Sequence, residues 1–258
     1  MCLIALAWRC HPRHSLVLIA NRDEFHGRPS ATAGFHADAP EVYGGRDLEK
    51  GGGWLEVSTR KRLAAVTNVR VGRTPEAAAR SRGELVHRCV RETGAALPSW
   101  LPETAGEFGR FNLLVWNGDE LQFAGNHPGF HTQAVEPGLH RLSNAVLDDD
   151  WPKARRAENV LRDWLGSDDA MAATPTLTSL FAVLAEREQA ADADLPDTGV
   201  GIELERMLSS PFIVGERYGT RSSTIVLADA DGILFCERSF GPNGQFLGET
   251  RQQLSYMP

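Results

Sequence analysis

Pairs of short apolar runs, each pair divided by turn residues, recur along the chain and predict β-hairpins. One pair flanks Asn117-Gly118 and another is divided by Asp231-Gly232, and both dipeptides are typical of tight hairpin turns. The strands 2–8 and 16–20, at the start of the chain, look fully buried, because polar residues do not alternate with the apolar ones. The predicted hairpins join 2–8 with 16–20, 54–58 with 63–68, 111–116 with 121–124 and 224–228 with 233–237, and a single short strand is predicted for 139–143.

Other segments have apolar residues at helical spacing. Leu177, Leu180, Phe181 and Leu184 recur at i, i+3, i+4 and i+7, which is typical of a helix that packs one face on a core. Two segments lack periodicity: 27–53, rich in Gly and polar residues, predicts a long loop that covers a site, and 190–199 predicts a surface loop. Helices are predicted for 74–93, 153–165, 177–188 and 202–208.

The order of these elements is hairpins, then helices, then a hairpin, without strand–helix–strand alternation. This order predicts an α+β layered sandwich with largely antiparallel sheets. No shift in composition marks a boundary, so we expect one domain spanning residues 1–258.

Composition narrows the class of protein. Hydrophobic residues make up 42% and charged residues 24% of the chain, as in soluble globular proteins. The net charge of -7 gives no electrostatic reason to expect nucleic acid or an anionic membrane surface as partner. The apolar stretch at 2–8 is too short for a signal-peptide core and no segment is long enough to span a bilayer. We therefore expect a cytoplasmic protein without integral membrane association.

Polar clusters in turns predict exposed loops. The run Arg60-Lys61-Arg62 predicts a solvated basic turn. The segment 10–14, with His11 and His14, predicts an exposed loop rather than a metal or haem cluster, and the histidines at 127 and 131 are interpreted in the same way. The four cysteines contain no CxxC pair and predict neither a zinc knuckle nor a disulfide framework. We expect no metal site.

Cys2 is the first candidate for chemistry. Removal of Met1 ahead of a small residue would leave a free α-amine and a thiol on one residue. An α-amine with a pKa of roughly 7.7 to 8.0 can accept the thiol proton. A cysteine at position two also fits a small apolar residue at the start of a buried strand.

The polar run Asn21-Arg22-Asp23-Glu24 is the second candidate, because it follows an apolar strand directly. Alternation along an extended chain places Arg22 and Glu24 on one face and Asn21 and Asp23 on the other. An acid–base pair there could orient an amine or a substrate carboxylate. A solvated turn is the competing interpretation.

These residues belong to a set of motifs that together resemble the NRDE family, also called the Transport and Golgi organisation 2 family. The resemblance covers nearly the whole chain. It implies a four-layer αββα Ntn-hydrolase-like sandwich and a more distant likeness to choloylglycine hydrolases and penicillin V acylases, which are amidases that begin with Cys. The motifs are Met1-Cys2-Leu3-Ile4, Asn21 to Phe25 followed by Arg28-Pro29, Gly52 to Leu55, Thr67-Asn68, Ser81 to Leu85, Phe111 to Leu114, Leu142 to Asn144 and Tyr218 to Ser222.

The resemblance also implies roles for single residues. Cys2 corresponds to the nucleophile, Asn68 resembles an oxyanion-hole amide, Asn144 resembles an Asn that binds the α-amine, and Arg221 resembles an Arg near the thiolate. The Asn-Arg-Asp-Glu run departs from the Arg-Asn-x-Asp pattern of those amidases, which leaves open whether Asp23 or Glu24 meets the amine. The predicted catalytic residues are Cys2, Asp23, Glu24, Asn68, Asn144 and Arg221, and the predicted substrate-binding residues are Asn21, Arg22 and Trp54.

Two functions follow from these predictions. The first is a cysteine amidohydrolase that cleaves a non-peptide C–N bond of a small-molecule amide and needs no cofactor. The alternative is a carrier that binds haem or an acyl-lipid without hydrolysis, because the family has been linked to haem trafficking and lipid homeostasis. A scaffold role is a third, weaker interpretation, and the sequence leaves substrate and oligomeric state open.

Overall fold

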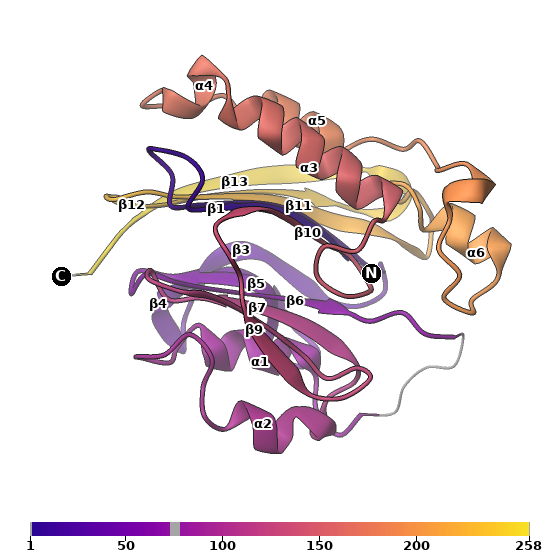
Figure 1. Ribbon diagram of the computed structural model, residues 1–258, viewed down its shortest axis with the longest axis horizontal. Helices are drawn as coiled ribbons and strands as arrows, with labels where there is room; N and C mark the ends of the chain where they lie inside the picture. The colour runs from indigo at the N-terminus through magenta and orange to yellow at the C-terminus, as the bar shows by residue number, and fades with distance from the viewer. Residues whose placement is uncertain (1, 73–77, 258) are drawn as a thin grey trace.

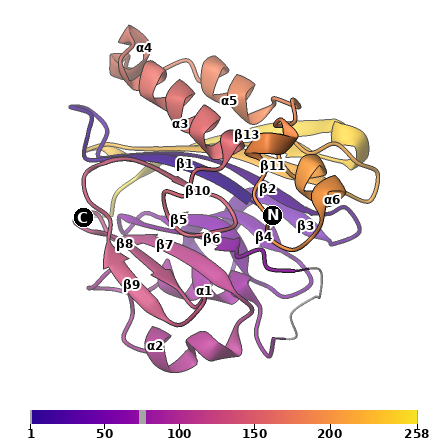
Figure 2. The same cartoon turned by 45° about the vertical axis from the view of Figure 1, so that its right-hand side comes forward.

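The architecture is a stack of four layers. The computed structural model describes residues 2–72 and 78–257. In this part of the chain two antiparallel sheets face each other, and helices cover both outer faces (Figure 1). Helices α3, α4 and α5 lie over one sheet, and α1 and α2 lie under the other, as the rotated view also shows (Figure 2). The predicted αββα sandwich is confirmed.

Hairpins build each sheet, but the six-stranded sheet does not follow chain order. It consists, in spatial order, of β10 (Gly138–Leu142), β1 (Cys2–Trp8), β2 (Leu16–Phe25), β11 (Tyr218–Ala228), β12 (Gly232–Phe240) and β13 (Phe246–Ser255). The seven-stranded sheet runs in chain order through β3 (Ser30–His36), β4 (Ala39–Asp47), β5 (Gly53–Ser58), β6 (Arg62–Asn68), β7 (Phe111–Trp116), β8 (Leu121–Gly125) and β9 (His131–Ala134).

Short helices connect these strands. The α-helices are α1 (Arg82–Cys89), α2 (Leu101–Thr104), α3 (Pro152–Leu165), α4 (Asp168–Met171), α5 (Thr178–Leu184) and α6 (Ile202–Met207), and single 3₁₀ turns lie at Ala105–Glu107, Asp192–Asp194 and Pro242–Gly244. None of the helices in the described ranges is both long and apolar enough to cross a bilayer.

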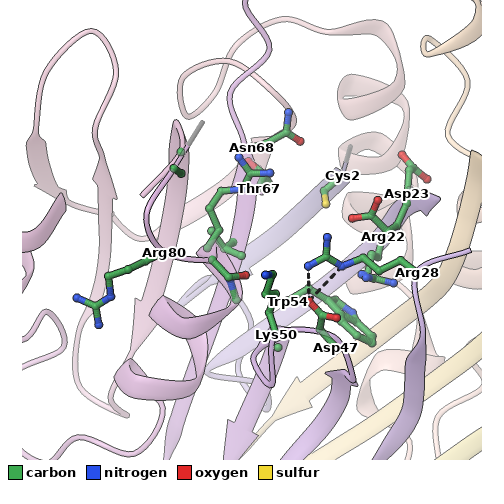
Figure 3. A pocket seen from close by; sticks show the side chains of 18 of the residues that line it. Cys2, Arg22, Asp23, Arg28, Asp47, Lys50, Trp54, Thr67, Asn68 and Arg80 are labelled. Carbon is green, nitrogen blue, oxygen red and sulfur yellow. Dashed lines mark hydrogen bonds and ion pairs between the residues drawn. The ribbon is translucent and has the colours of Figure 1, made fainter. Parts of the chain in front are cut away.

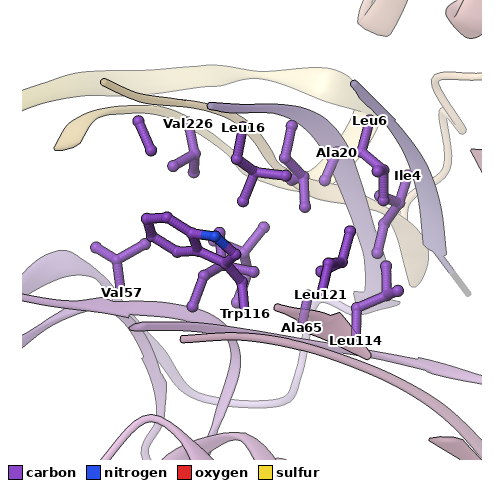
Figure 4. Packing of buried hydrophobic residues seen from close by; sticks show 14 of the residues in the cluster. Ile4, Leu6, Leu16, Ala20, Val57, Ala65, Leu114, Trp116, Leu121 and Val226 are labelled. Atoms are coloured by element: carbon purple, nitrogen blue, oxygen red, sulfur yellow. The ribbon is translucent and has the colours of Figure 1, made fainter. Parts of the chain in front are cut away.

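The main core lies between the sheets (Figure 4). Because successive side chains of a strand point to opposite faces, Ile4 and Leu6 of β1 enter this inter-sheet core, whereas Leu3 and Ala5 pack against the helices above. Full burial of a side chain such as Leu6 stabilises the fold by about 1.5–3 kcal/mol. The strand β1 is therefore apolar on both faces because both faces are covered.

Helix α3 covers the outer face of the six-stranded sheet. Pro152 lies in its first turn, where the missing N–H costs no helical hydrogen bond. Its buried stripe includes Ala154, Ala157, Leu161 and Trp164, and the small residues let the helix approach β1 closely. The helix also buries Lys153, which is 1% exposed.

The prediction of a long loop for residues 27–53 is wrong, because this segment forms β3 and β4. The two strands pair with register shifts between Ala31 and Gly34 and between Phe35 and His36. These irregularities break the two-residue alternation by which a half-buried strand is recognised.

Two element boundaries and the burial of one residue also differ from prediction. Strand β2 continues through Phe25, so the run from Asn21 is part of a strand and not a solvated turn. The helix predicted for 74–93 is shorter, Arg82–Cys89, and residues 73–77 lie outside the described part. Arg62 is not solvated: it is 2% exposed and donates to the carbonyl groups of Cys89 and Ala96.

The histidine loops were only partly predicted. His14 is buried at 3% exposure, and its Nε2 lies 2.9 Å from the Ala170 carbonyl oxygen. His131 begins strand β9. The predicted exposure of the 10–14 turn is therefore correct for Cys10 and wrong for His14.

Candidate functional site

A cavity of about 420 Å³ opens between the two sheets, at the end where β1 begins and β6 ends. Cys2 of β1 and Arg22 of β2 form part of its wall on one side, and Trp54 of β5 and Asn68 of β6 form part of the opposite wall. In Figure 3 the Cys2 sulfur points into this space. The inter-sheet layer is therefore apolar along most of its length and polar at this end.

Cys2 and Arg22 are direct cross-strand partners in the antiparallel pair β1–β2. Partners in this register place their side chains on the same face of the sheet. Arg22 is 7% exposed and its guanidinium stacks 4.3 Å from the centre of the Trp54 ring. Burial lowers the pKa of Arg22, and the electrostatic influence of Glu24, Cys2 and Asp47 opposes that effect. Arg22 is thus placed to stabilise negative charge on the sulfur or on a ligand.

Two asparagine side chains meet beside the cavity, one at the end of β6 and the other after β10. Asn144 Nδ2 donates to Asn68 Oδ1 and to the Asn68 carbonyl oxygen, at 3.0 Å each. The Oδ1 atom of Asn68 is therefore occupied, and the donor group Nδ2 is the part of this amide left for a ligand. Ser143 continues the network, since its Oγ lies 3.0 Å from the Cys2 carbonyl oxygen and 3.3 Å from Asn144 Oδ1.

A buried charge pair stands behind Cys2 on the helical side of the sheet. Asp23 is 2% exposed and accepts a hydrogen bond of 2.7 Å from Thr220 Oγ1. Burial raises the pKa of Asp23, whereas the positive charge of Lys153 lowers it. Burial also lowers the pKa of Lys153, and Asp23 is the first group that opposes this effect. Lys153 of α3 donates to the Leu208 carbonyl oxygen at 3.1 Å, so the segment after α6 fixes it.

Arg70 and Glu205 link α6 to the end of β6. Their ion pair of 2.7 Å is almost completely buried, and burial lowers the pKa of Arg70 to about 10. The Arg70 guanidinium also lies over the Trp151 ring, and its backbone N–H donates to the Asn144 carbonyl oxygen at 2.8 Å. Asn144 is therefore held by its main chain as well as by its side chain.

The opposite wall brings further charges. Arg28 Nη2 and Asp47 Oδ2 form an ion pair of 2.5 Å at the cavity edge. The Trp54 ring passes over Gly45, where an added Cβ atom would lie 2.1 Å from the ring carbon Cη2. A glycine at position 45 therefore permits the position that Trp54 takes above Arg22.

Helix α1 closes the cavity at its N-terminus. Ser81 caps the helix by accepting a hydrogen bond from the Gly83 N–H, and Ser81, Arg82 and Gly83 line the cavity. A Cβ atom at Gly52 would lie 2.3 Å from the Gly83 carbonyl carbon. Two glycines at this crossing therefore allow the helix to approach the start of β5 closely.

The structure brings four of the predicted catalytic residues to the cavity wall, namely Cys2, Asp23, Glu24 and Asn68, together with the predicted binding residues Arg22 and Trp54. Three others lie outside its lining. Asn144 acts on Asn68, and the Asn21 amide donates to the carbonyl groups of Leu184 and Pro211 on the helical side. Arg221, expected near the thiolate, instead donates to the carbonyl groups of Phe25, His26 and Arg28.

Sequence reasoning missed several residues of this region. Arg28 and the Ser81–Gly83 segment belong to motifs that were recognised without a role, so a signal existed for them. Lys153, Arg70 and Glu205 carried none, because each is a single charged residue in a segment of ordinary composition. Their charges become significant only when burial is known.

The two facing antiparallel sheets with helices on both outer faces give the chain an Ntn-hydrolase-like fold. It is similar to the structure of penicillin V acylase from Agrobacterium tumefaciens, with a TM-score of 0.51 and 11% identity over 93% of this chain and 83% of that one. It is also similar to a variant of conjugated bile acid hydrolase from Clostridium perfringens, with a TM-score of 0.51 and 7% identity over 100% and 97% of the two chains. At such identities the likeness shows the fold alone.

Sequence comparison then gives the family. The family model described as Transport and Golgi organisation 2 matches residues 1–242. The chain is 35% identical to the Homo sapiens Transport and Golgi organization protein 2 homolog, with 97% of each chain covered, and 34% identical to the Bos taurus homolog, with 93% of each covered. This chain belongs to the Transport and Golgi organisation 2 family, and the resemblance stated from its motifs is confirmed.

Proposed function

We propose that this protein is a cysteine-type Ntn amidohydrolase that cleaves the amide bond of small molecules carrying an anionic group. The observation that carries the proposal is the arrangement at one end of the inter-sheet layer, where Cys2 lies opposite Arg22 and beside the Asn68–Asn144 pair. The structural neighbours that share the fold are, by name, an acylase and a bile acid hydrolase, and the proposal extends that class of reaction to this chain.

The reaction begins with the α-amine that Cys2 acquires once Met1 is removed. This amine takes the thiol proton, and the sulfur attacks the carbonyl carbon of the substrate. The Asn68 Nδ2 group donates to the oxyanion of the tetrahedral intermediate. The C–N bond then breaks, the leaving amine takes the proton from the α-ammonium group, and a thioester remains on Cys2. Water hydrolyses the thioester, which releases the acid and restores the thiol.

Asp23 is the carboxylate that we assign to the α-amine. In the strand register Arg22 lies opposite Cys2, so Asp23 lies beside the N-terminal end of β1. Glu24 is directed differently, because its Oε1 accepts from the Phe25 N–H at 2.8 Å. Asp23 thus orients the base, Thr220 holds Asp23 in place by a hydrogen bond, and the positive charge of Lys153 favours its ionised form.

The charges of the wall support the choice of an anionic substrate. Arg28 is paired with Asp47, and Arg80 is paired with Glu84 and Glu107. Arg22 and Lys50 have no carboxylate of the described residues within 4.0 Å, although both line the cavity. A buried guanidinium without an ion pair is costly, and a carboxylate or phosphate group of the substrate would offset that cost.

Intact-mass spectrometry tests the proposal. The exposed Cys10 is first replaced by Ser, because Cys89 and Cys236 are already buried. The protein is then incubated with a p-nitroanilide whose acyl chain ends in a carboxylate. We expect the mass to be lower than that of the full sequence by one Met residue before the reaction and to rise by one acyl group during it, and the acyl group to be absent from the Cys2→Ala variant. Equal acylation of that variant would contradict the proposal.

A haem titration of the same proteins tests the carrier function predicted from the sequence. Haem carries carboxylates that would face the cationic wall, and Cys2 would then serve as a thiolate ligand. A saturable shift of the Soret band that Cys2→Ala abolishes, combined with no acylation of the unmodified protein, would replace hydrolysis by haem carriage.

A further inference from the structure

A second cluster of polar side chains lies outside the cavity, between the seven-stranded sheet and helix α1. His36 ends β3, Glu56 lies in β5 and His87 lies in α1. One nitrogen or oxygen atom of each lies within 4.8 Å of those of the other two. These three residues come from distant positions in the sequence, and the fold brings them to one point.

The His36 ring faces Glu56 in an arrangement that lacks a proton donor. His36 Nε2 lies 3.2 Å from the Gly44 carbonyl oxygen, which makes Nε2 the protonated nitrogen. The other nitrogen, Nδ1, then presents a lone pair to Glu56 Oε1 at 4.0 Å. His36 is 5% and Glu56 is 0% exposed, and neither of these two atoms has a hydrogen-bond partner among the described residues. Two buried acceptors facing each other are stabilised by a proton or a metal cation between them.

His87 completes the cluster from the helix. Its Nδ1 lies 3.2 Å from Glu56 Oε2, and its Nε2 lies 3.5 Å from Asp38 Oδ2. A histidine that binds a metal through one nitrogen characteristically donates the other N–H to a carboxylate or a carbonyl oxygen. The Gly44 carbonyl oxygen therefore occupies the outer position beside His36, and Asp38 is the acceptor beside His87 Nε2, a position that it shares with Arg91.

The charges of the neighbourhood leave Glu56 available. Arg46 forms an ion pair with Asp38 through both of its terminal nitrogens. Arg91 Nη1 lies 3.3 Å from His87 Nε2 and not beside the carboxylate. Among the described residues no Arg or Lys side chain contacts the buried carboxyl group of Glu56, which leaves its oxygens available to a divalent ion.

We propose that His36, Glu56 and His87 bind a divalent first-row transition metal, with Zn²⁺ as the best match. Two imidazole nitrogens and one carboxylate are typical ligands of Zn²⁺, with a water molecule in a fourth position. Ligand atoms on a tetrahedral Zn²⁺ lie about 3.3 Å apart when each bond is about 2.0 Å. The 3.2 Å between His87 Nδ1 and Glu56 Oε2 matches that value, whereas His36 Nδ1 lies 4.0 Å from the other oxygen, Oε1, and would move closer when the ion binds.

The site ties helix α1 to the sheet next to the cavity. Gly53 lines the cavity, and a Cβ atom there would lie 2.0 Å from Glu56 Oε1. The N-terminal residues of α1 line the same cavity. The metal therefore has a structural role that holds two parts of the cavity wall together, and the inference does not depend on the proposed hydrolase activity.

Metal binding to the full chain tests the proposal directly. Protein freed of metal by a chelator is titrated with Zn²⁺ by calorimetry, dialysed and analysed for metal content. We expect one zinc ion per chain and a higher Tm with zinc. His87→Gln should weaken binding by at least about 100-fold and Asp38→Asn by about 10-fold. The matched control is His11→Gln in the hairpin turn between β1 and β2, which should bind zinc as the unmodified protein does.

The Co²⁺ complex gives a second measurement that does not require a folded variant. We expect the visible absorption of a nitrogen- and oxygen-ligated ion without a thiolate charge-transfer band. Such a band, or loss of binding in His11→Gln, would place the metal at the Cys10–His14 turn and overturn the proposal. Failure of the unmodified protein to retain zinc, or retention of Mg²⁺ or Ca²⁺ alone, would overturn it as well.

Discussion

The two ends of the inter-sheet layer are built by the same strands and have opposite character. Strand β1 sends Ile4 and Leu6 into the sealed core, and Cys2 of the same strand enters the cavity. Strand β2 does the same with Leu18 and Ala20, followed by Arg22. The alternation of side chains continues without interruption, so the site needs no special backbone on these two strands.

A third strand shows where the change of character occurs. In β12, Phe235 belongs to the apolar core, and Glu237 is two residues further on the same face at 1% exposure. Its carboxylate accepts from the Ala33 N–H and from Thr224 Oγ1. A polar residue at this boundary is thus tolerated because it finds partners from both sheets.

The largest effect is expected from damage to the sealed end. Leu6→Ala should lower the free energy of unfolding by about 2–5 kcal/mol, because it leaves a cavity in a packed core. Urea unfolding followed by circular dichroism measures this change. The matched control, Leu247→Ala, alters a side chain that is 59% exposed and should leave the midpoint unchanged. A small effect at Leu6 would mean that the apolar end is not the source of stability.

Damage to the polar end should lower the rate of the reaction rather than the stability of the fold. Asn68→Ala should slow acylation of Cys2 by about 10²–10³-fold, because the oxyanion loses a donor. Quenched-flow mass analysis at saturating substrate gives the rate. Asn144→Asp, which cannot donate to Asn68 Oδ1, should lower the rate less, and an unaltered rate in Asn68→Ala would separate this residue from the chemistry.

Glu237 makes the boundary sensitive to pH. Burial raises its pKa from 4.5 to about 7, so the folded state favours the neutral carboxyl. Below pH 4.5 the group is protonated in both states and costs nothing. As pH rises to 7 the unfolded chain releases this proton first, and stability falls by about 3 kcal/mol. Unfolding of the unmodified protein minus that of Glu237→Gln, measured from about pH 4 to 8, should show this loss. A flat difference would contradict the assignment.

The smallest effect concerns recognition of the anion. Arg22→Lys should raise KM for a carboxylate-bearing amide by about tenfold, since lysine lacks the planar group that stacks on Trp54. The KM for an uncharged amide should change little. Arg217→Lys, an exposed position, serves as control. If KM changes equally for both substrates, Arg22 positions Cys2 and does not bind the anion.

Much of the fold was predictable because its central strands carry unbroken apolar runs. The edge strand β10 was predicted, but the edge strands β3, β9 and β13 were not, nor was β4, the neighbour of β3. In β13 only Leu254 is buried, so no apolar pattern identifies it, and in β3 and β4 register shifts disturb the alternation. An edge strand is defined by its hydrogen bonds to a neighbour, which sequence pattern does not encode.

The residues of the site also fall into those that the sequence identified and those that it did not. The motifs drew attention to Cys2, Asn68 and Asn144, and strand alternation correctly separated Arg22 from Asn21. In the sequence, nothing distinguishes Lys153 from an ordinary polar residue of an amphipathic helix. Its proximity to Asp23 depends on how α3 lies on the sheet, and no local pattern contains that information.

Arg221 occupies a β-bulge between Thr220 and Ser222, and its guanidinium holds three carbonyl groups of the passage that leads from β2 to β3. That passage crosses from one sheet to the other and carries Arg28 to the cavity edge. Loss of Arg221 would free the crossover and displace a wall residue without touching the sulfur. An inactive Arg221 variant would therefore indicate a displaced crossover and not a missing catalytic group. Only a structure or a binding measurement of that variant would distinguish these two causes.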